Sequence, residues 1–405
     1  MAVGSGDFGV LHPVQGVRIG IASAGIKKVG RKDIVVFELA EDSAVAGVFT
    51  KNAFCAAPVT IAKAHLQQAS TRYWLINTGN ANAGTGPSGL EAAKQCCSAL
   101  ADLASCPTEQ VLPFSTGVIG EPLPTAKIIS ALPAALADLA ADHWAEAASG
   151  IMTTDTRPKA CSRQLDWQGK TITVTGISKG AGMIKPNMAT MLGYVACDAR
   201  IPQSLLQDLV SEAAEQSFNR ITVDGDTSTN DACMLVATGA SGVEVSEQQP
   251  ELLAALKTLI NDVFLDLAQA IVRDGEGATK FVEVAVSGAG SADEALKVAY
   301  TVAESPLVKT ALFASDPNWG RILAAIGRAG VEGLDVSGVQ VHLGDVLIAD
   351  KGGRAASYTE EAGAAVMKQD EIVIAIDLGR GAAAEKVWTT DFSYDYVKIN
   401  AEYRS

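Results

Sequence analysis

The chain has 405 residues, 48% of them hydrophobic and 19% charged, which is typical of a globular protein with a large core. Its formal net charge is −14, and because no basic block offsets this charge, a nucleic-acid partner is not expected. The amino-terminal segment lacks the form of a signal peptide, and no uncharged apolar run reaches about 18 residues. We therefore expect a cytoplasmic protein with no membrane partner.

The cysteines and histidines give no support to a metal site. The seven cysteines are scattered and contain no C-x-x-C pair, so structural disulfides and a zinc site are not expected. The four histidines are isolated in the sequence. A Ser–His or Cys–His catalyst therefore has no support in the sequence.

The amino-terminal part predicts strands rich in Val, Ile and Phe. They are expected at residues 16–21, 34–39, 45–50 and 74–78. An irregular loop of Gly and Asn, residues 79–86, precedes a helix predicted over 89–104. This loop is either a plain strand-to-helix connection or a phosphate-binding loop, although it matches no P-loop spacing.

A second stretch with chemical content, residues 110–120, predicts a short strand that ends at Ser115-Thr116-Gly117. This end is either an ordinary turn or an oxyanion hole, in which the Gly117 N–H and the Thr116 hydroxyl are the two donors. A helix is predicted over 125–141. In the hydroxyl-rich turn 151–158, Thr153 either binds a substrate or caps the turn.

The central segment lies between a strand predicted at 171–177 and an apolar run at 191–197. Its glycines and Pro186 constrain the backbone, and Thr190 stands where this loop enters the second strand. Thr190 is either a β-branched residue that starts a strand or a nucleophile. If the Ala189–Thr190 bond were cut, the free α-amine of Thr190 would be the base for its own hydroxyl.

Next come an amphipathic helix predicted over 202–218 and an acidic loop, residues 220–231. This loop, with Asp224, Asp226 and Asp231, is either a metal site or a hydrogen-bonded loop, and it lacks EF-hand spacing.

A long helix with one apolar face is predicted over 251–272, and a strand over 281–286. Between them Glu276 is flanked by two glycines, as expected of a solvated turn acid. A helix is then predicted over 292–313 with a break near Pro306, and another over 322–329.

The carboxyl-terminal part predicts strands at 339–348 and 372–378. Gly379-Arg380-Gly381 separates the latter from residues 384–391, and these two runs are predicted to pair as an antiparallel hairpin. The tail, 394–405, does not have the composition of a disordered segment. Because strands and helices mix without a regular βαβ repeat, we predict an α/β or α+β fold with much antiparallel sheet.

The run Lys179-Gly-Ala-Gly-Met-Ile-Lys-Pro-Asn-Met-Ala-Thr-Met-Leu192 resembles the self-cleavage segment of the glutamate N-acetyltransferase family, the ornithine acetyltransferases. Matching pieces extend over essentially the whole chain. The resemblance implies layered sheets sandwiched by helices, distinct from the usual N-terminal-nucleophile fold. It also implies cleavage into chains 1–189 and 190–405 that share one core, with two copies of each in the assembly.

The resemblance also implies a function and a set of site residues. The reaction is transfer of acetyl from N2-acetylornithine to glutamate in arginine biosynthesis, with no cofactor or metal. Acetyl-CoA becomes a co-substrate if the enzyme is bifunctional. Thr116 and Gly117 correspond to the oxyanion hole, and the Asn-Thr-Gly-Asn-Ala-Asn-Ala motif of residues 77–83 to site scaffolding. The substrate-binding residues implied are Thr153, Lys179, Thr190, Glu276, Asn400 and Ser405.

Two other functional classes remain open at this point. One is an amidohydrolase or aminopeptidase that uses the same amino-terminal threonine but passes the acyl group to water. Its deacetylation would not depend on glutamate. The other is a metal- or nucleotide-binding protein built on the acidic loop, and loss of activity with a chelator would favour it.

Overall fold

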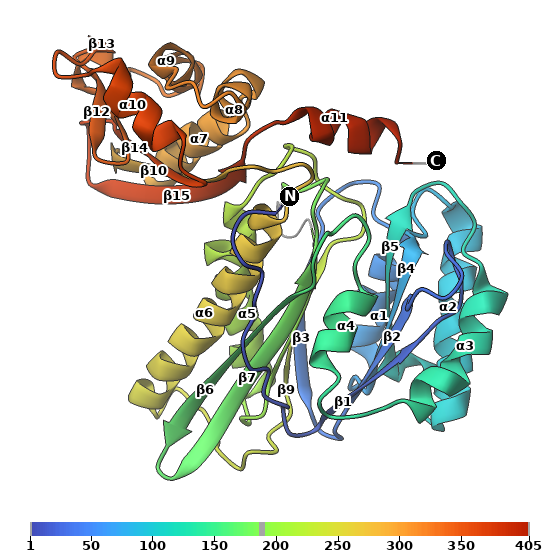
Figure 1. Cartoon of the computed structure of the whole chain (residues 1–405). Helices are drawn as coiled ribbons and strands as arrows, with labels where there is room; N and C mark the ends of the chain where they lie inside the picture. The colour runs from blue at the N-terminus through green and yellow to red at the C-terminus, as the bar shows by residue number, and fades with distance from the viewer. Residues whose placement is uncertain (1, 186–190, 404–405) are drawn as a thin grey trace.

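Two β-sheets lie face to face in the larger part of the molecule, with helices on their outer faces (Figure 1). The computed structural model describes residues 2–185 and 191–403. The first sheet has the order β1-β2-β4-β5, formed by Val17–Ala22, Ile34–Leu39, Tyr73–Asn80 and Val111–Val118. The second has the order β3-β9-β8-β7-β6, formed by Ala44–Phe49, Ala232–Ala237, Leu192–Cys197, Lys170–Lys179 and Lys159–Trp167.

An aromatic cluster fills the space between these two sheets. The rings of Phe37 and Trp74 from the first sheet are 5.3 Å apart, and Tyr194 from the second lies 5.5 Å from Trp74. Such tilted pairs add to the free energy gained by burying large rings. Because β8 is covered on both faces, all six of its residues are buried. This core joins residues from both sides of position 189.

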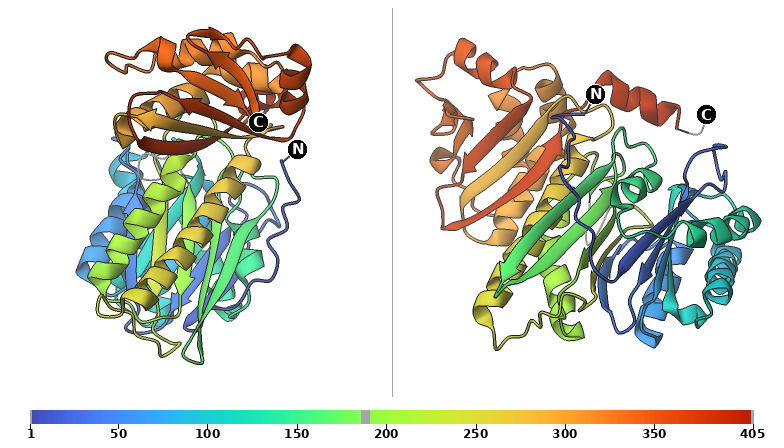
Figure 2. Two further views of the ribbon diagram at one scale, coloured as in Figure 1. Left: turned by 90° about the vertical axis from the view of Figure 1, so that its left-hand side faces the viewer. Right: turned by 60° about the horizontal axis from the view of Figure 1, so that its bottom comes forward.

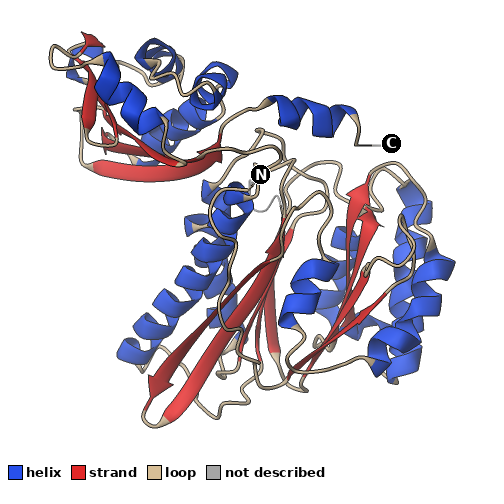
Figure 3. Ribbon diagram, viewed as in Figure 1, coloured by secondary structure: helices blue, strands red, loops and turns tan. Residues whose placement is uncertain are grey.

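Helices cover the outer face of each of these sheets (Figure 3). Apolar side chains of α6 (Pro250–Arg273) recur at helical spacing, and Pro250 stands in its first turn, where a missing N–H costs little. The first sheet is covered by α1 (Ala57–Gln68), α2 (Gly86–Ala104) and α3 (Thr125–Ala137). The second is covered by α5 (Gln203–Gln216) and α6 (Pro250–Arg273), and α4 is Trp144–Gly150.

A third sheet with its own core forms the carboxyl-terminal part (Figure 1 and Figure 2). Its order is β13-β12-β11-β14-β10-β15, formed by Gly353–Arg354, Val346–Asp350, Gln340–Leu343, Glu371–Asp377, Phe281–Ala289 and Ala383–Thr390. The helices of this part are α7 (Ala292–Ala303), α8 (Pro306–Phe313), α9 (Trp319–Gly327) and α10 (Glu360–Met367). The mixed α/β fold with layered sheets and helices is therefore confirmed.

The predicted hairpin between residues 372–378 and 384–391 is wrong. Strand β10 lies between β14 and β15, parallel to the first and antiparallel to the second. The connector crosses the end of β10, where the Arg380 N–H donates to the Gly288 carbonyl at 2.8 Å. A Cβ at Gly381 would lie 2.2 Å from the Ala289 carbonyl oxygen. The glycines are therefore needed because the connection between β14 and β15 passes close over the end of β10.

The single strand predicted over 339–348 is also wrong, because it is two strands, β11 and β12, joined at Gly344. Gly344 has a φ of 52°, which favours a turn there. The break predicted near Pro306 is confirmed, since α7 ends at Ala303 and α8 begins at Pro306.

The carboxyl-terminal helix α11 (Tyr394–Ala401) leaves the third sheet and returns over the larger part (Figure 1). Just before α11, the end of β15 is fixed by the buried Lys309 side chain, which donates to the Thr389 hydroxyl at 2.8 Å. The Tyr396 hydroxyl then donates to Asp224 at 3.3 Å. Within the described residues, no helix is both long and apolar enough to cross a membrane.

Candidate functional site

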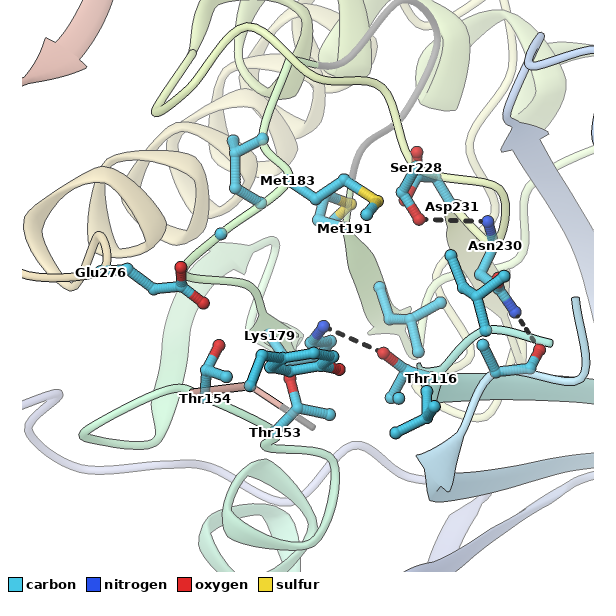
Figure 4. A pocket seen from close by; sticks show the side chains of 18 of the residues that line it. Thr116, Thr153, Thr154, Lys179, Met183, Met191, Ser228, Asn230, Asp231 and Glu276 are labelled. Atoms are coloured by element: carbon cyan, nitrogen blue, oxygen red, sulfur yellow. Dashed lines mark hydrogen bonds between the residues drawn. The ribbon is translucent and has the colours of Figure 1, made fainter. Parts of the chain in front are cut away.

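A cavity opens where strands of the two facing sheets end, and it encloses about 950 Å³ of empty space, counting solvent at its mouth. Lys179, the last residue of β7, pairs with Leu192, the first residue of β8, and Leu192 pairs with Ala232 at the start of β9. Thr116 and Gly117 come from β5 in the other sheet. Figure 4 shows the side chains of Lys179 and Thr116 pointing toward one another in this cavity.

Thr116 and Lys179 are in direct contact across the two sheets. The Lys179 ammonium donates to the Thr116 hydroxyl oxygen at 3.0 Å. An ammonium cannot accept a hydrogen bond, so the hydroxyl proton of Thr116 stays available to another acceptor. Burial lowers the pKa of Lys179, and the nearby Asp155 carboxylate is the strongest effect that opposes this shift.

Gly117 is required at its position by the neighbouring strand. Its φ is 137°, and a Cβ there would lie 2.3 Å from the carbonyl carbon of Gly79. Gly79 is its register partner in β4. Only glycine allows this approach, which places a backbone amide in the cavity wall beside the Thr116 hydroxyl.

Glu276 and Asn400 meet on the opposite wall. The Asn400 amide donates to the Glu276 carboxylate at 2.7 Å, which joins α11 to the connector after α6. A Cβ at Gly182 would lie 2.4 Å from that carboxylate. The buried Glu276 is therefore a cavity group, and the structure overturns its interpretation as a solvated turn acid.

Thr153 lines the same cavity, and a buried ionic triad holds its loop. The Lys159 ammonium lies 2.6 Å from Asp155 and 2.7 Å from Asp274, and all three side chains are at most 1% exposed. Asp155 also accepts the Thr153 N–H at 2.9 Å and the Gly180 N–H at 2.7 Å. The triad thus fixes Thr153 relative to the end of β7.

The pKa of Asp155 reflects two opposed effects. Burial by itself would raise this pKa. The ammonium groups of Lys159 and Lys179 and the hydrogen bonds outweigh burial and hold the pKa well below its usual range. Asp155 is therefore ionised in the folded protein.

Asn230 and Asp231 line the cavity too, although no sequence pattern indicated a role for them in an acyl-transfer site. The Asn230 amide donates to the Ser115 carbonyl at 2.9 Å, next to Thr116. Burial raises the pKa of Asp231 well above its usual range, which favours a neutral acid. Asn230 and Asp231 come directly before β9. A sequence prediction of β9 as the neighbour of β8 would therefore have placed both residues at the edge of the sheet where the cavity lies.

The acidic loop is used in hydrogen bonds to the backbone. Asp224 accepts the N–H groups of Met183 and Ile184 at 2.7 and 2.8 Å, which supports the loop after β7. Over residues 2–185 and 191–403, no three His, Cys, Asp or Glu side chains are grouped so as to hold a metal ion. The hydrogen-bonded interpretation of this loop fits the geometry.

The Asn-rich loop that follows β4 is also a scaffold. Asn77 accepts the Ser115 hydroxyl at 2.6 Å and donates to the Asn80 carbonyl at 2.9 Å. Asn82 donates to the Gly89 carbonyl at 2.9 Å, which ties the loop to α2. These contacts fit the structural interpretation of the loop.

The structure thus brings together six of the predicted site residues: Thr116, Gly117, Thr153, Lys179, Glu276 and Asn400. Ala189, Thr190 and Ser405 lie outside the described residues. Met191, which follows Thr190 in the chain, lines the cavity.

Comparisons with known proteins agree over the whole chain. The sequence profile of the ArgJ family matches residues 18–405. Proteins named arginine biosynthesis bifunctional protein ArgJ from Pseudomonas syringae pv. tomato and Pseudomonas fluorescens are 64% and 63% identical to this chain, each covering 100% of both sequences. A crystal structure of the protein of that name from Bacillus halodurans is 39% identical, covers 50% of this chain and 95% of its own, and has a TM-score of 0.48. This chain therefore belongs to the ArgJ family.

Proposed function

We propose that this chain transfers an acetyl group from N2-acetylornithine to glutamate, a step of arginine biosynthesis that yields ornithine and N-acetylglutamate. The observation that carries the proposal is the convergence of oxyanion donors, an ammonium and a carboxylate on one cavity beside the start of β8. Full-length relatives at 63% and 64% identity that are named for arginine biosynthesis support it.

The proposal begins with self-cleavage. The Thr190 hydroxyl attacks the Ala189 carbonyl, the acyl group shifts from nitrogen to oxygen, and water hydrolyses the ester. The products are a chain of residues 1–189 and a chain of residues 190–405. The new α-amine has a reference pKa of about 7.7–8.0, so much of it is unprotonated near neutral pH.

Acetyl transfer then follows two half-reactions through Thr190. Its Oγ attacks the acetyl carbonyl while the α-amine takes the hydroxyl proton. The Thr116 hydroxyl and the Gly117 N–H donate to the oxyanion. When the intermediate collapses, the C–N bond breaks and ornithine leaves with the proton from the α-ammonium. Attack by the α-amine of glutamate on the acetyl ester then regenerates the Thr190 hydroxyl.

Opposite charges orient the donor. Lys179 keeps N–H groups for the substrate carboxylate besides the one given to Thr116, because an ammonium has three donors. Glu276, held by Asn400, receives the side-chain ammonium of ornithine, and Thr153 and Ser405 complete the contacts. No cofactor is needed, and acetyl-CoA is an alternative donor. The assembly contains two copies of each cleaved chain.

The test compares deacetylation of N2-acetylornithine with and without glutamate. Ornithine and N-acetylglutamate should form in equal amounts, and ornithine release should stop near one equivalent per site when glutamate is omitted. Continuous release of acetate without glutamate would instead identify the amidohydrolase. Release abolished by a chelator would favour the metal-binding alternative.

A further inference from the structure

A second cavity, here called the basic pocket, adjoins the first. The two share Gly117, Val118, Thr153, Thr154 and Tyr403 in their walls. The other residues that line the basic pocket are Lys27, Lys28, Arg31, Asp33, Thr78, Gly79 and Ile399. Three cations of the loop between β1 and β2 thus lie beside the proposed oxyanion hole, in a chain whose formal net charge is −14.

Two of the three cations of this pocket, Arg31 and Lys27, are held in place by neutral groups. The Arg31 guanidinium donates to the Met152 carbonyl at 2.6 Å, and the Lys27 ammonium donates to the Tyr403 carbonyl at 3.3 Å. Carbonyl dipoles orient a cation without cancelling its charge. The acidic residue in the wall, Asp33, uses both carboxylate oxygens to accept the N–H groups of Ala24 and Ile26, at 2.6 and 2.7 Å.

The loop that carries these cations packs against the strand beside the oxyanion donors. A Cβ at Gly79 would lie 3.2 Å from the Cβ of Lys27, and Gly79 is the register partner of Gly117. The Arg31 guanidinium is hydrogen-bonded to the carbonyl of Met152, the residue before Thr153, and Thr153 lines both cavities. A small substrate in the first cavity can therefore reach the second past glycine and threonine.

The charges of the first cavity suit only one of the two amino acids in the proposed reaction. Within the part of the chain that the structure describes, its wall contains one basic residue, Lys179, and two acidic residues, Asp231 and Glu276. Lys179 can hold the α-carboxylate that both amino acids carry, and Glu276 can hold the ammonium of ornithine. The side chain of glutamate carries the opposite charge, so Glu276 repels it.

From this opposition we infer that the basic pocket binds the side-chain carboxylate of glutamate, the acetyl acceptor. Donor and acceptor then share the α-carboxylate contact and the acetyl position, while their side chains point to walls of opposite charge. This inference rests on the proposed function and extends it to how one site accepts two side chains of opposite charge.

The test separates the two half-reactions in the variant Lys27→Met/Lys28→Met, because lysine side chains on an exposed loop can be truncated without disturbing the core. Lys94→Met, an exposed lysine of α2, is the control for removal of positive charge. The first half-reaction is the burst of ornithine from N2-acetylornithine without glutamate. The second is decay of the acetyl-enzyme with glutamate or glutamine as acceptor.

We expect the burst to keep its rate and amplitude, while kcat/KM for glutamate falls about tenfold or more for each charge-assisted hydrogen bond removed. The preference for glutamate over glutamine should fall with it, because the side chain of glutamine is uncharged. Lys94→Met should match the wild type in both steps.

Several results would overturn the inference. They are an unchanged kcat/KM for glutamate, an equal decrease with glutamine, or an equal decrease in the burst. A selective decrease with acetyl-CoA as donor would assign the pocket to phosphate groups instead. Absence of any ornithine burst in the wild type would contradict the proposed function itself. That outcome differs from failure of this inference, in which the wild type still shows the burst.

Discussion

The Lys179 ammonium and the Thr116 hydroxyl, which come from different sheets, form a 3.0 Å hydrogen bond in the wall of the cavity. Because an ammonium only donates, this contact leaves the Thr116 hydroxyl proton available to another acceptor, such as an oxyanion in the cavity. In the proposed reaction Lys179 therefore acts in two ways, by binding a substrate carboxylate and by orienting an oxyanion donor.

A double-mutant cycle separates these two effects of Lys179. Thr116→Val should lower kcat by about 10²–10³, the usual cost of an oxyanion donor. If Lys179 orients Thr116, then Lys179→Met should lower kcat much less in the Thr116→Val background than in the wild type. Fully additive effects on kcat would limit Lys179 to substrate binding. Thr258→Val, on the exposed face of α6, is the control.

The pH profile should also report Lys179. Burial lowers its pKa, so its donor proton dissociates at a lower pH than for an ordinary lysine, which gives an alkaline limb to kcat/KM. Lys179→Arg should remove that limb or move it upward, because guanidinium does not titrate in this range. The acid limb, assigned to the Thr190 amine, should stay in place. An unmoved alkaline limb in Lys179→Arg would assign it to another group.

The buried triad makes a prediction about stability. Lys159→Met leaves Asp155 and Asp274 buried without their shared cation, which should cost about 3–5 kcal/mol of unfolding free energy at pH 7. Because the pKa of Asp155 is depressed in the folded wild type, its stabilising effect is present above about pH 4 and is lost as the pH falls. Urea denaturation at pH 7, and at about pH 3 where part of this stabilisation is lost, measures both effects.

The matched control is Lys94→Met on the exposed face of α2, which should change the unfolding free energy by no more than about 0.5 kcal/mol. A Lys159→Met protein as stable as this control at pH 7 would show that the triad contributes nothing to stability.

Lys309 should make stability rise with pH. Burial lowers its pKa to about 7 in the folded protein, whereas an unfolded lysine titrates near 10.4. Between these values the unfolded chain binds more protons, so the free energy of unfolding increases as pH rises from about 7 to about 10. Lys309→Met should flatten this part of the curve of chemical denaturation against pH. Parallel curves of unfolding free energy against pH for the two proteins would contradict the lowered pKa of Lys309.

Local sequence patterns predicted much of the fold because its strands are apolar and most of its helices amphipathic. The run Ile34–Leu39 is almost continuously apolar, as expected of a buried strand, and α6 has an apolar stripe with helical periodicity. Strand β6 was missed because its middle is polar and exposed. Strand β9 was missed because its run Ala-Cys-Met-Leu-Val-Ala has only one β-branched residue and no alternation with polar residues. The hairpin error arose because two glycines typical of a turn serve a crossing over β10.

The site was predicted residue by residue, but its contacts were not. Family resemblance named Thr116, Lys179 and Glu276, and all three line one cavity. The Lys179–Thr116 bond depends on how two sheets pack, which no local pattern contains. The same holds for the Lys159–Asp274 ion pair, whose partners are far apart in sequence.

Self-cleavage makes Thr190 an amino terminus, and the intact mass of the protein under denaturing conditions shows directly whether it has occurred. We predict two species, residues 1–189 and residues 190–405, in the purified wild type, and one full-length species in Thr190→Ala. A single wild-type species of 405 residues that stays uncleaved over time while it turns over N2-acetylornithine would contradict the account, because Thr190 would then have no free amine.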